Sequence, residues 1–350
     1  MDTTTDLVEL FALQPRVSLE DYASPAAFAA RHRALAAKVD ALRARDASGQ
    51  PRSPALVVWP ESVGAPLLFL DHVPRVRRST SLQGALKRVV RAEAWGVWKA
   101  WGDFRPPSLT ECLYAARAPL VHRALWDTFS GIARDFGLWV VAGSALLPAG
   151  RRGEGSPHFE PFSARTYNTS YTFSPEGNRV ATARKANLVP SWENGLHLSP
   201  GRPEDLPVLQ TPFGKLATLI GYDGFAQPHT RDEPWFVPCA QYLDAMRVDI
   251  LAHPDIHTGP GAPPPQGEVR PDAERWQQEG LPAQLRTLQN VRYVVSAQQV
   301  GSLFGDTFTA TSHILERTAS GDVRVLAQAQ TTQEEDVVHA TVPIPEQGTP

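Results

Sequence analysis

Short apolar runs, rich in β-branched residues and bounded by glycine or proline, recur along the chain. Continuous apolar runs of about four to eight residues are typical of strands that are buried on both faces. Such runs predict strands at residues 55–59, 138–143, 216–220, 248–252 and 291–296. The chain is therefore expected to build its core around sheets that are covered on both sides.

Helical patterns lie between these strands. Apolar residues recur at three- and four-residue spacing in 25–42 and 119–136, and 234–246 and 281–290 are further helical candidates. Alternating strands and helices predict an α/β fold. A hairpin is expected to begin at Tyr167, with its turn at 175–178, and a terminal meander at 312–316, 323–328 and 336–342.

Two stretches interrupt this rhythm and are predicted to be insertions, at about 76–110 and 255–282. The first contains a Trp-rich segment, 82–104, whose apolar residues recur at near-helical spacing beside four lysines and arginines. A basic amphipathic helix with tryptophans can lie on a membrane surface. The favoured alternative is a helix packed on the body or on a second subunit. The second stretch contains GPGAPPPQG, which predicts a loop and not core.

Composition narrows the class of protein. The 350 residues include 42% hydrophobic and 20% charged residues, which is typical of a folded chain. The net charge of −3 argues against a nucleic-acid partner. Two cysteines cannot form a disulfide framework, which favours a reducing compartment. With no secretory pattern and no apolar run of transmembrane length, we expect a cytoplasmic protein.

Three places could carry chemistry. Glu61 directly follows the predicted strand at 55–59, and α/β folds place ligand sites at the carboxyl ends of strands. Lys185 follows the predicted hairpin, and Glu193 comes soon after it. The third place is a sharp turn, Gly221-Tyr222-Asp223-Gly224, directly after a buried strand, where many hydrolases display a nucleophile. Taken singly, each is more commonly a surface charge or an ordinary turn.

Together and in this order, these segments resemble the carbon–nitrogen hydrolase (nitrilase) superfamily. Trp59-Pro60-Glu61 looks like its catalytic-glutamate motif, and Lys185 with Leu188 and Pro190 looks like its catalytic-lysine motif. Glu193 matches the second glutamate that often follows. Residues 214–223 are similar to the strand that ends in the family's Cys-Tyr-Asp turn. Residues 288–301 also resemble the family, although Gln298 stands where asparagine is usual, and the match covers roughly 7–342.

The resemblance implies a four-layer α-β-β-α sandwich and an assembly as a homodimer or larger homo-oligomer. It implies one domain, 1–342, followed by a loose tail at 343–350. In the family a cysteine thiolate attacks an amide or nitrile carbon, a glutamate is the base, and a lysine and a backbone N–H stabilise the oxyanion. By position, Glu61 is the base, Lys185 and the Tyr222 backbone N–H are the oxyanion donors, and Glu193 positions the substrate.

The chain departs from the family at the nucleophile, because Gly221 occupies the position of the cysteine. Glycine has no side chain that could attack carbon. No motif brings Cys112 or Cys239 to this position, and both are expected to be small buried residues. The sequence therefore predicts a hydrolase by descent that is impaired or inactive, a pseudoenzyme.

Other interpretations stay open. The chain could be a non-catalytic binding or interaction protein, associated with a membrane through residues 82–104, or a slow hydrolase in which Glu61 activates water. It could also be a normal amidase in which Gly221 is not the natural residue. We expect an amide, nitrile or carboxylate as ligand and a membrane surface as the less favoured partner. We expect no cofactor and no metal, since His229, His253 and His257 lack the usual ligand spacing.

Overall fold

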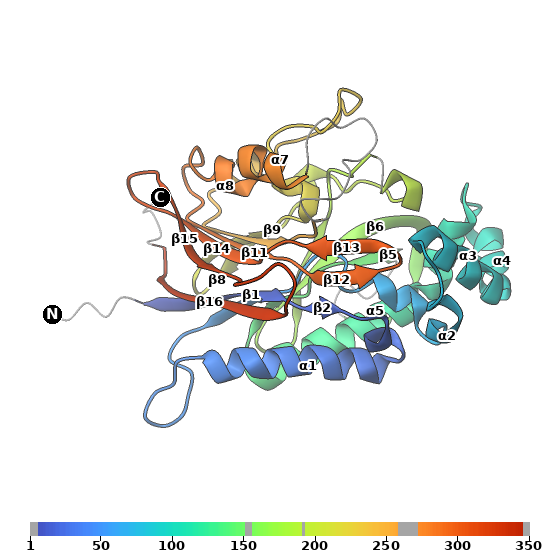
Figure 1. The fold of residues 1–350 in the computed structure, drawn as a ribbon, viewed down its shortest axis with the longest axis horizontal. Coiled ribbons are helices and arrows are strands. Elements are labelled where there is room, and N and C mark those ends of the chain that lie inside the picture. The colour runs from blue at the N-terminus through green and yellow to red at the C-terminus, as the bar shows by residue number, and fades with distance from the viewer. Residues whose placement is uncertain (1–5, 151–155, 191–192, 258–271, 346–350) are drawn as a thin grey trace.

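A computed structural model describes residues 6–150, 156–190, 193–257 and 272–345. Its strands form two large sheets and a small one (Figure 1). The first sheet has the order β16 (Asp336–Pro343), β1 (Leu7–Gln14), β3 (Ala55–Val58), β4 (Trp139–Val141), β6 (Pro161–Phe173) and β5 (Ala145–Gly150), and β7 (Arg179–Arg184) pairs with β6. The second has the order β15 (Val323–Gln328), β14 (His313–Arg317), β11 (Tyr293–Ala297), β10 (Ile250–Pro254), β9 (Gly214–Thr218) and β8 (Val208–Thr211). The small sheet joins β13 (Asp306–Thr309), β12 (Val300–Leu303) and β2 (Arg16–Val17).

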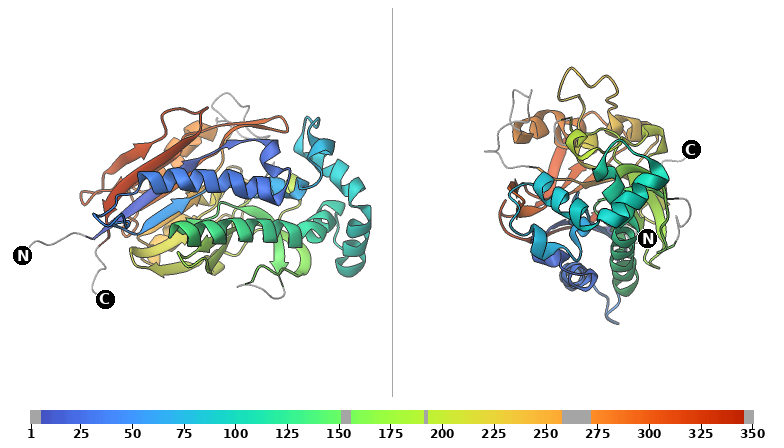
Figure 2. Two further views of the ribbon diagram at one scale, coloured as in Figure 1. Left: turned by 90° about the horizontal axis from the view of Figure 1, so that it is seen from below. Right: turned by 90° about the vertical axis from the view of Figure 1, so that its right-hand side faces the viewer.

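Helices cover the outer faces of the two large sheets. The long helices α1 (Pro25–Leu42) and α5 (Leu109–Phe136) lie side by side on the first sheet (Figure 2). The helices α6 (Cys239–Ala245), α7 (Asp272–Glu279) and α8 (Leu281–Gln284) pack on the second. Three further helices, α2 (Val73–Val76), α3 (Leu82–Ala92) and α4 (Ala94–Phe104), gather at one end of the molecule. Short 3-10 turns complete the described elements, at Leu19–Tyr22, Ala65–Phe69, Asn194–Leu196, Pro203–Asp205 and Gly221–Gly224.

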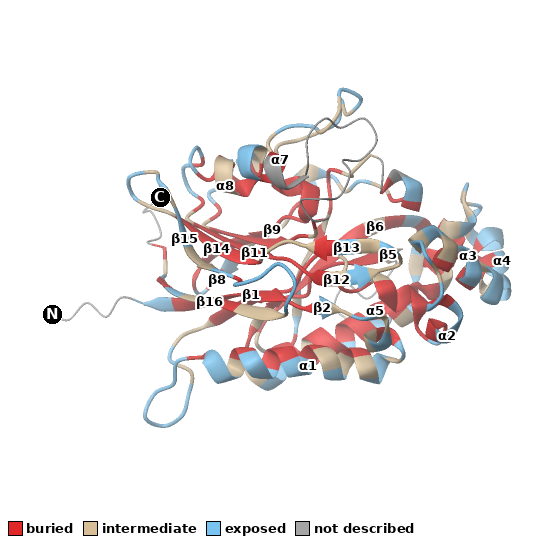
Figure 3. Ribbon diagram, viewed as in Figure 1, coloured by how far each residue is buried: buried red, intermediate tan, exposed pale blue. Residues whose placement is uncertain are grey.

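The two sheets face each other across a shared apolar core. Leu10 and Leu56 of the first sheet belong to one buried cluster with Leu216 and Val295 of the second. Figure 3 shows the central strands of the molecule coloured mainly as buried. In both sheets the central strands are parallel, namely β1, β3 and β4, and β9, β10 and β11. Parallel strands buried on both faces explain the continuous apolar runs of the sequence. The predicted α/β four-layer sandwich is confirmed.

Three predictions about helices were wrong in their extent. Helix α5 begins at Leu109, after the N-cap Ser108, and carries Pro119 in its interior. An interior proline costs about 3 kcal/mol, but α5 buries a long apolar face against the first sheet, and that packing outweighs the loss. The candidates at 234–246 and 281–290 form only the short helices α6 and α8.

The Trp-rich segment 82–104 is also not one helix. It divides at Glu93 into α3 and α4, because the Glu93 carboxylate accepts hydrogen bonds from His72 and Arg117 and holds the break against the body.

The second insertion and the tail are more ordered than the sequence predicts. Residues 258–271 lie outside the described part of the chain, but α7 follows them and its Trp276 is buried. A tryptophan in the core contradicts a simple loop over 255–282. Likewise β16 extends to Pro343, and the N–H of Ile344 donates to the carbonyl of Asp6, so the tail begins later than residue 343.

Candidate functional site

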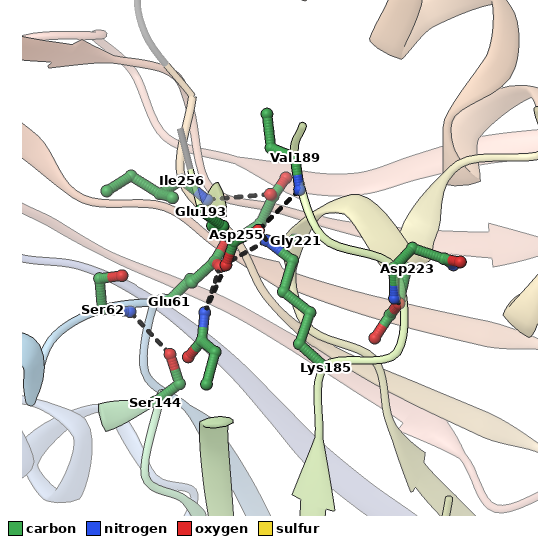
Figure 4. A network of polar contacts seen from close by, with 12 residues as sticks. Glu61, Ser62, Ser144, Lys185, Val189, Glu193, Gly221, Asp223, Asp255 and Ile256 are labelled. Atoms are coloured by element: carbon green, nitrogen blue, oxygen red, sulfur yellow. Dashed lines mark hydrogen bonds and ion pairs between the residues drawn. The ribbon is translucent and has the colours of Figure 1, made fainter. Parts of the chain in front are cut away.

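A buried cluster of charged groups lies between the two sheets, just beyond the carboxyl ends of their strands. The ammonium of Lys185 sits 2.9 Å from Oε1 of Glu61 and 2.8 Å from Oε2 of Glu193 (Figure 4). The three side chains are almost fully buried, with relative exposures of 2–6%. The structure therefore brings together the three charged residues that the sequence singled out far apart in the chain.

Backbone contacts fix the position of each group. The N–H of Glu61 donates to the carbonyl of Asp255, which links the end of β3 to the end of β10. The N–H of Lys185 donates to the carbonyl of Asn168 on β6. The carboxylate of Glu193 accepts from the backbone N–H of Val189 at 2.8 Å, which closes its own loop. Each charged side chain is therefore held by a different part of the fold.

Asn168 is a site residue that the sequence analysis missed. Its Nδ2 donates to Oε1 of Glu61 at 2.7 Å and to Oε1 of Glu193 at 3.3 Å. These two acceptors fix the orientation of the amide. Its Oδ1 is buried, and no residue in the described ranges donates a hydrogen bond to it. An unpaired buried acceptor is costly, so this oxygen is suited to a ligand that brings an N–H or O–H.

Gly221 lies at the sharp turn after β9 and faces Glu61. Its φ is +49°, a backbone conformation that residues with a side chain rarely adopt. The carbonyl of Gly221 accepts a hydrogen bond from Nε2 of His253 at 2.9 Å. A Cβ built on Gly221 would lie 2.9 Å from the carboxyl carbon of Glu61 and would overlap Oε2. The Glu61 carboxylate thus occupies the space directly over Gly221, which disfavours a water there as one of the open interpretations requires.

The same turn is tied to the lysine loop through Asp223. Its buried carboxylate accepts from the N–H groups of Ala186 and Asn187, at 3.0 and 2.7 Å. Burial raises the pKa of Asp223 to about 6, although these backbone hydrogen bonds oppose the rise. Asp223 therefore fixes Gly221 and Lys185 relative to each other. Tyr222, beside it, lines the cavity, and its hydroxyl donates to Glu233 at 2.7 Å.

Neither cysteine can replace the nucleophile. Cys112 on α5 and Cys239 at the start of α6 are buried free thiols in the outer helical layers, as expected. The Sγ of Cys239 lies 3.9 Å from Oδ1 of Asp223, but neither cysteine lines the cavity. Burial raises the pKa of both thiols, which disfavours the reactive thiolate.

A second buried group adjoins Glu61. The carboxylate of Asp255 accepts from Nε2 of Gln298 at 2.6 Å and lies 2.7 Å from Nε2 of His257. Burial opposes ionisation, but His257 and His253 outweigh it and hold the pKa of Asp255 below its ordinary value. Gln298, at the position where the family's asparagine is usual, thus positions this carboxylate. Within the described ranges, no group of three or more His, Cys, Asp or Glu residues could hold a metal ion.

A cavity of about 700 Å³ opens over the charged cluster. Glu61, Lys185, Glu193, Asn168 and Gly221 form its polar end. The rest of the wall is mostly apolar and comes from several separate parts of the chain, with contributions from Leu68, Phe69, Leu82, Leu86, Phe304 and Phe308. The cavity can therefore hold a molecule with a small polar head and a larger apolar body.

Burial and the charged groups at the polar end shift the pKa values of Glu61 and Lys185. Burial raises the pKa of Glu61 to about 7, with Lys185 opposing and Glu193 and Asp255 adding to the rise. Burial alone would lower the pKa of Lys185, but Glu193 and Glu61 outweigh it and raise that pKa overall. Lys185 is thus a fixed cation, while Glu61 can exchange a proton near neutral pH.

Glu61 is expected to make folding stability depend on pH. Because its folded pKa lies above the ordinary value of 4.5, the folded chain binds this proton more tightly than the unfolded chain does. The stability that it contributes is present below about pH 4.5 and is lost as the pH rises towards 7. Relative to Glu61→Gln, the unaltered chain should lose about 1–3 kcal/mol across this window. Urea unfolding of both proteins at several pH values measures their free energies of unfolding. If the free energy of the unaltered chain minus that of Glu61→Gln stays flat or rises with pH, the result would contradict the assignment.

Known proteins that are similar to this chain belong to the family that its motifs resemble. The profile of the carbon–nitrogen hydrolase family matches residues 55–348. Among solved structures, a carbon–nitrogen hydrolase from Helicobacter pylori G27 has a TM-score of 0.56 at 15% identity, covering 97% of this chain and 90% of that one. A cysteine-to-alanine mutant of the amidase from Nesterenkonia sp. AN1, of the nitrilase superfamily, has a TM-score of 0.56 at 16% identity, with 97% and 91% covered. At such identities the likeness shows the fold.

Another structure of the Nesterenkonia amidase carries acrylamide added to its active-site cysteine, with a TM-score of 0.52 at 16% identity and 97% and 93% covered. No curated protein matched this chain by sequence. Within the described residues, no helix is long and apolar enough to cross a membrane.

Proposed function

Since the chain belongs to the carbon–nitrogen hydrolase family, we propose that it keeps the family's polar pocket as a binding site but has lost thiol-dependent hydrolysis. One observation carries this proposal: the turn that faces Glu61 and Lys185 presents Gly221, which has no side-chain atom. Covalent catalysis needs a nucleophile at this point. Gly221 supplies no atom at this position that could attack an amide or nitrile carbon.

The retained charges support a binding role. A buried Glu–Lys–Glu arrangement is expensive to desolvate, and such groups add little to stability on balance. Here the cluster lines a cavity instead of being sealed in the core. Lys185 supplies a fixed positive charge, Asn168 an unpaired acceptor and Glu61 a carboxyl that can exchange a proton. These groups suit a ligand with both a carbonyl oxygen and an N–H.

The shape of the cavity adds a second requirement for the ligand, an apolar part. A small amide would occupy only the polar end, and most of the wall is apolar. The Nesterenkonia amidase has been captured with acrylamide, which shows that a pocket of this fold accepts a primary amide. For this chain we propose a primary amide, or a related carboxylate, that bears a long hydrocarbon group.

Affinity for primary amides should rise with chain length. Each CH₂ that enters the apolar part should contribute about 0.8 kcal/mol, or roughly fourfold in the dissociation constant, until the cavity is filled. Asn168→Leu should weaken binding about tenfold, because a hydrogen-bond acceptor in the polar end is lost. Isothermal titration of the series from acetamide to decanamide measures both effects.

Asn178→Leu is the matched control, since Asn178 lies in the exposed turn between β6 and β7. It should bind the amides like the unaltered chain. Affinity that does not change with chain length, or an equal loss in both asparagine variants, would count against this pocket as the binding site.

A further inference from the structure

Helix α4 presents three tryptophans to solvent at the end of the molecule. Trp95, Trp98 and Trp101 have relative exposures of 74%, 62% and 50%, and the rings of Trp95 and Trp98 stack at 5.3 Å. We call these three residues the tryptophan patch. Large exposed aromatic clusters usually mark a site of interaction. Figure 3 shows the outer side of α4 as mainly exposed.

The body of the protein does not cover these rings. Helix α4 packs on α5 with its opposite side, through the buried Val97 and Ala100 and through Gly96, whose backbone approaches Ala116. The arrangement favoured from the sequence, a helix packed on the body, thus accounts for one side of α4 and leaves the tryptophan side without a partner in the part of the chain that the structure describes.

The surroundings of the tryptophan patch are positively charged. Residues 71–105 contain eight lysines and arginines against three acidic residues, whereas the whole chain has a net charge of −3. Lys87, Arg88, Arg91 and Lys99 on α3 and α4 are all exposed. Of the three acidic residues, Glu93 is already paired with Arg117 at 2.8 Å. Arg77 lies 3.5 Å from Glu20, but the four exposed cations on α3 and α4 face solvent and can meet an anionic partner.

We propose that α3 and α4 dock on an anionic lipid surface. Tryptophan rings favour the headgroup level of a bilayer, and each nearby lysine or arginine adds attraction to anionic lipid. A second copy of the chain fits less well, because a twofold contact would bring two basic surfaces together. Helix α3 also lines the cavity, through Leu82 and Leu86. Docking in this way places the apolar wall of the pocket beside the lipid.

Vesicle co-sedimentation of the full chain without any amide tests the docking separately from ligand binding. We expect sedimentation with phosphatidylcholine vesicles that contain about 30% phosphatidylserine, and at least tenfold weaker binding to phosphatidylcholine alone. Raising the salt from about 0.05 to 0.5 M should release most of the protein. Trp98→Glu with Trp101→Glu should weaken binding at least tenfold, and so should Lys87→Glu with Arg88→Glu, which keeps the rings.

Trp235→Glu is the matched control, because Trp235 is 88% exposed and lies outside α3 and α4, just before α6. It should leave sedimentation unchanged, and circular dichroism should show all variants folded. Three results would overturn the proposal: no sedimentation with anionic vesicles, equal binding to neutral vesicles, or an equal loss in Trp235→Glu. A dimer in light scattering that only the patch variants break, without vesicle binding, would assign the surface to a second copy.

Discussion

Lys185→Met is expected to lower the free energy of unfolding by about 3–5 kcal/mol and to abolish amide binding. The substitution leaves Glu61 and Glu193 buried and facing each other without the cation that lies 2.9 and 2.8 Å from them. Removing one partner of a buried ion pair costs far more than the pair contributes, because the remaining charge is desolvated and unpaired. Here two carboxylates lose the same partner.

Urea unfolding at pH 8, above the pKa of about 7 that Glu61 has in the unaltered chain, measures this loss. Lys87→Met provides the control, because Lys87 is exposed and its removal should change stability by no more than about 0.5 kcal/mol. Adding Glu61→Gln and Glu193→Gln to Lys185→Met should restore much of the stability, since no buried charge then remains. Equal costs for the two lysine variants would show that the cluster is not an electrostatic unit.

The sequence predicted the sheets because their strands bury both faces. The run at 55–59 coincides with β3 apart from one residue, and the run at 291–296 overlaps β11; both strands are buried throughout. Residues without such a pattern were missed. Strand β1 reads LVELFALQ, and its Glu9 interrupts the apolar run, although that side chain is buried and paired with Arg43. Only the tertiary partner makes this glutamate compatible with the core.

The site was predictable where it depends on motifs and not where it depends on contacts across the fold. Glu61, Lys185, Glu193 and Gly221 follow from their resemblance to family segments. Asn168 lies 107 positions from Glu61 in sequence and within a plain strand, so nothing local marks it. Sequence alone also could not show that the carboxylate of Glu61 lies over Gly221, because that depends on how two sheets are placed.

The exposure of the tryptophan patch was likewise beyond the sequence. The spacing of Trp98 and Trp101 predicts a helix equally well whether they face the body, a second subunit or solvent. The helix break at Glu93 and the packing of Val97 on α5 determine that the rings face solvent. Both involve residues outside the segment, such as Arg117.

Hydrolysis of amides by the unaltered chain is expected to be absent. In hydrolases whose groups act together, removal of the nucleophile lowers the rate on the order of a millionfold. The geometry also disfavours rescue by water directly over Gly221, because Oε2 of Glu61 fills that space. Gly221→Cys is a useful comparison, although a cysteine there must adopt a φ near +49° and displace the Glu61 carboxylate.

Ammonia release from a panel of short and long primary amides and nitriles tests this claim most directly. The unaltered chain, Glu61→Gln and Gly221→Cys are measured side by side. Each is given the amide or nitrile at a concentration that saturates the binding site. We predict release at the rate of the buffer blank from the unaltered chain and from Glu61→Gln, while the unaltered chain still binds decanamide in titration. Release from the unaltered chain that Glu61→Gln abolishes would contradict this account, because it would show that the site hydrolyses amides without a thiol.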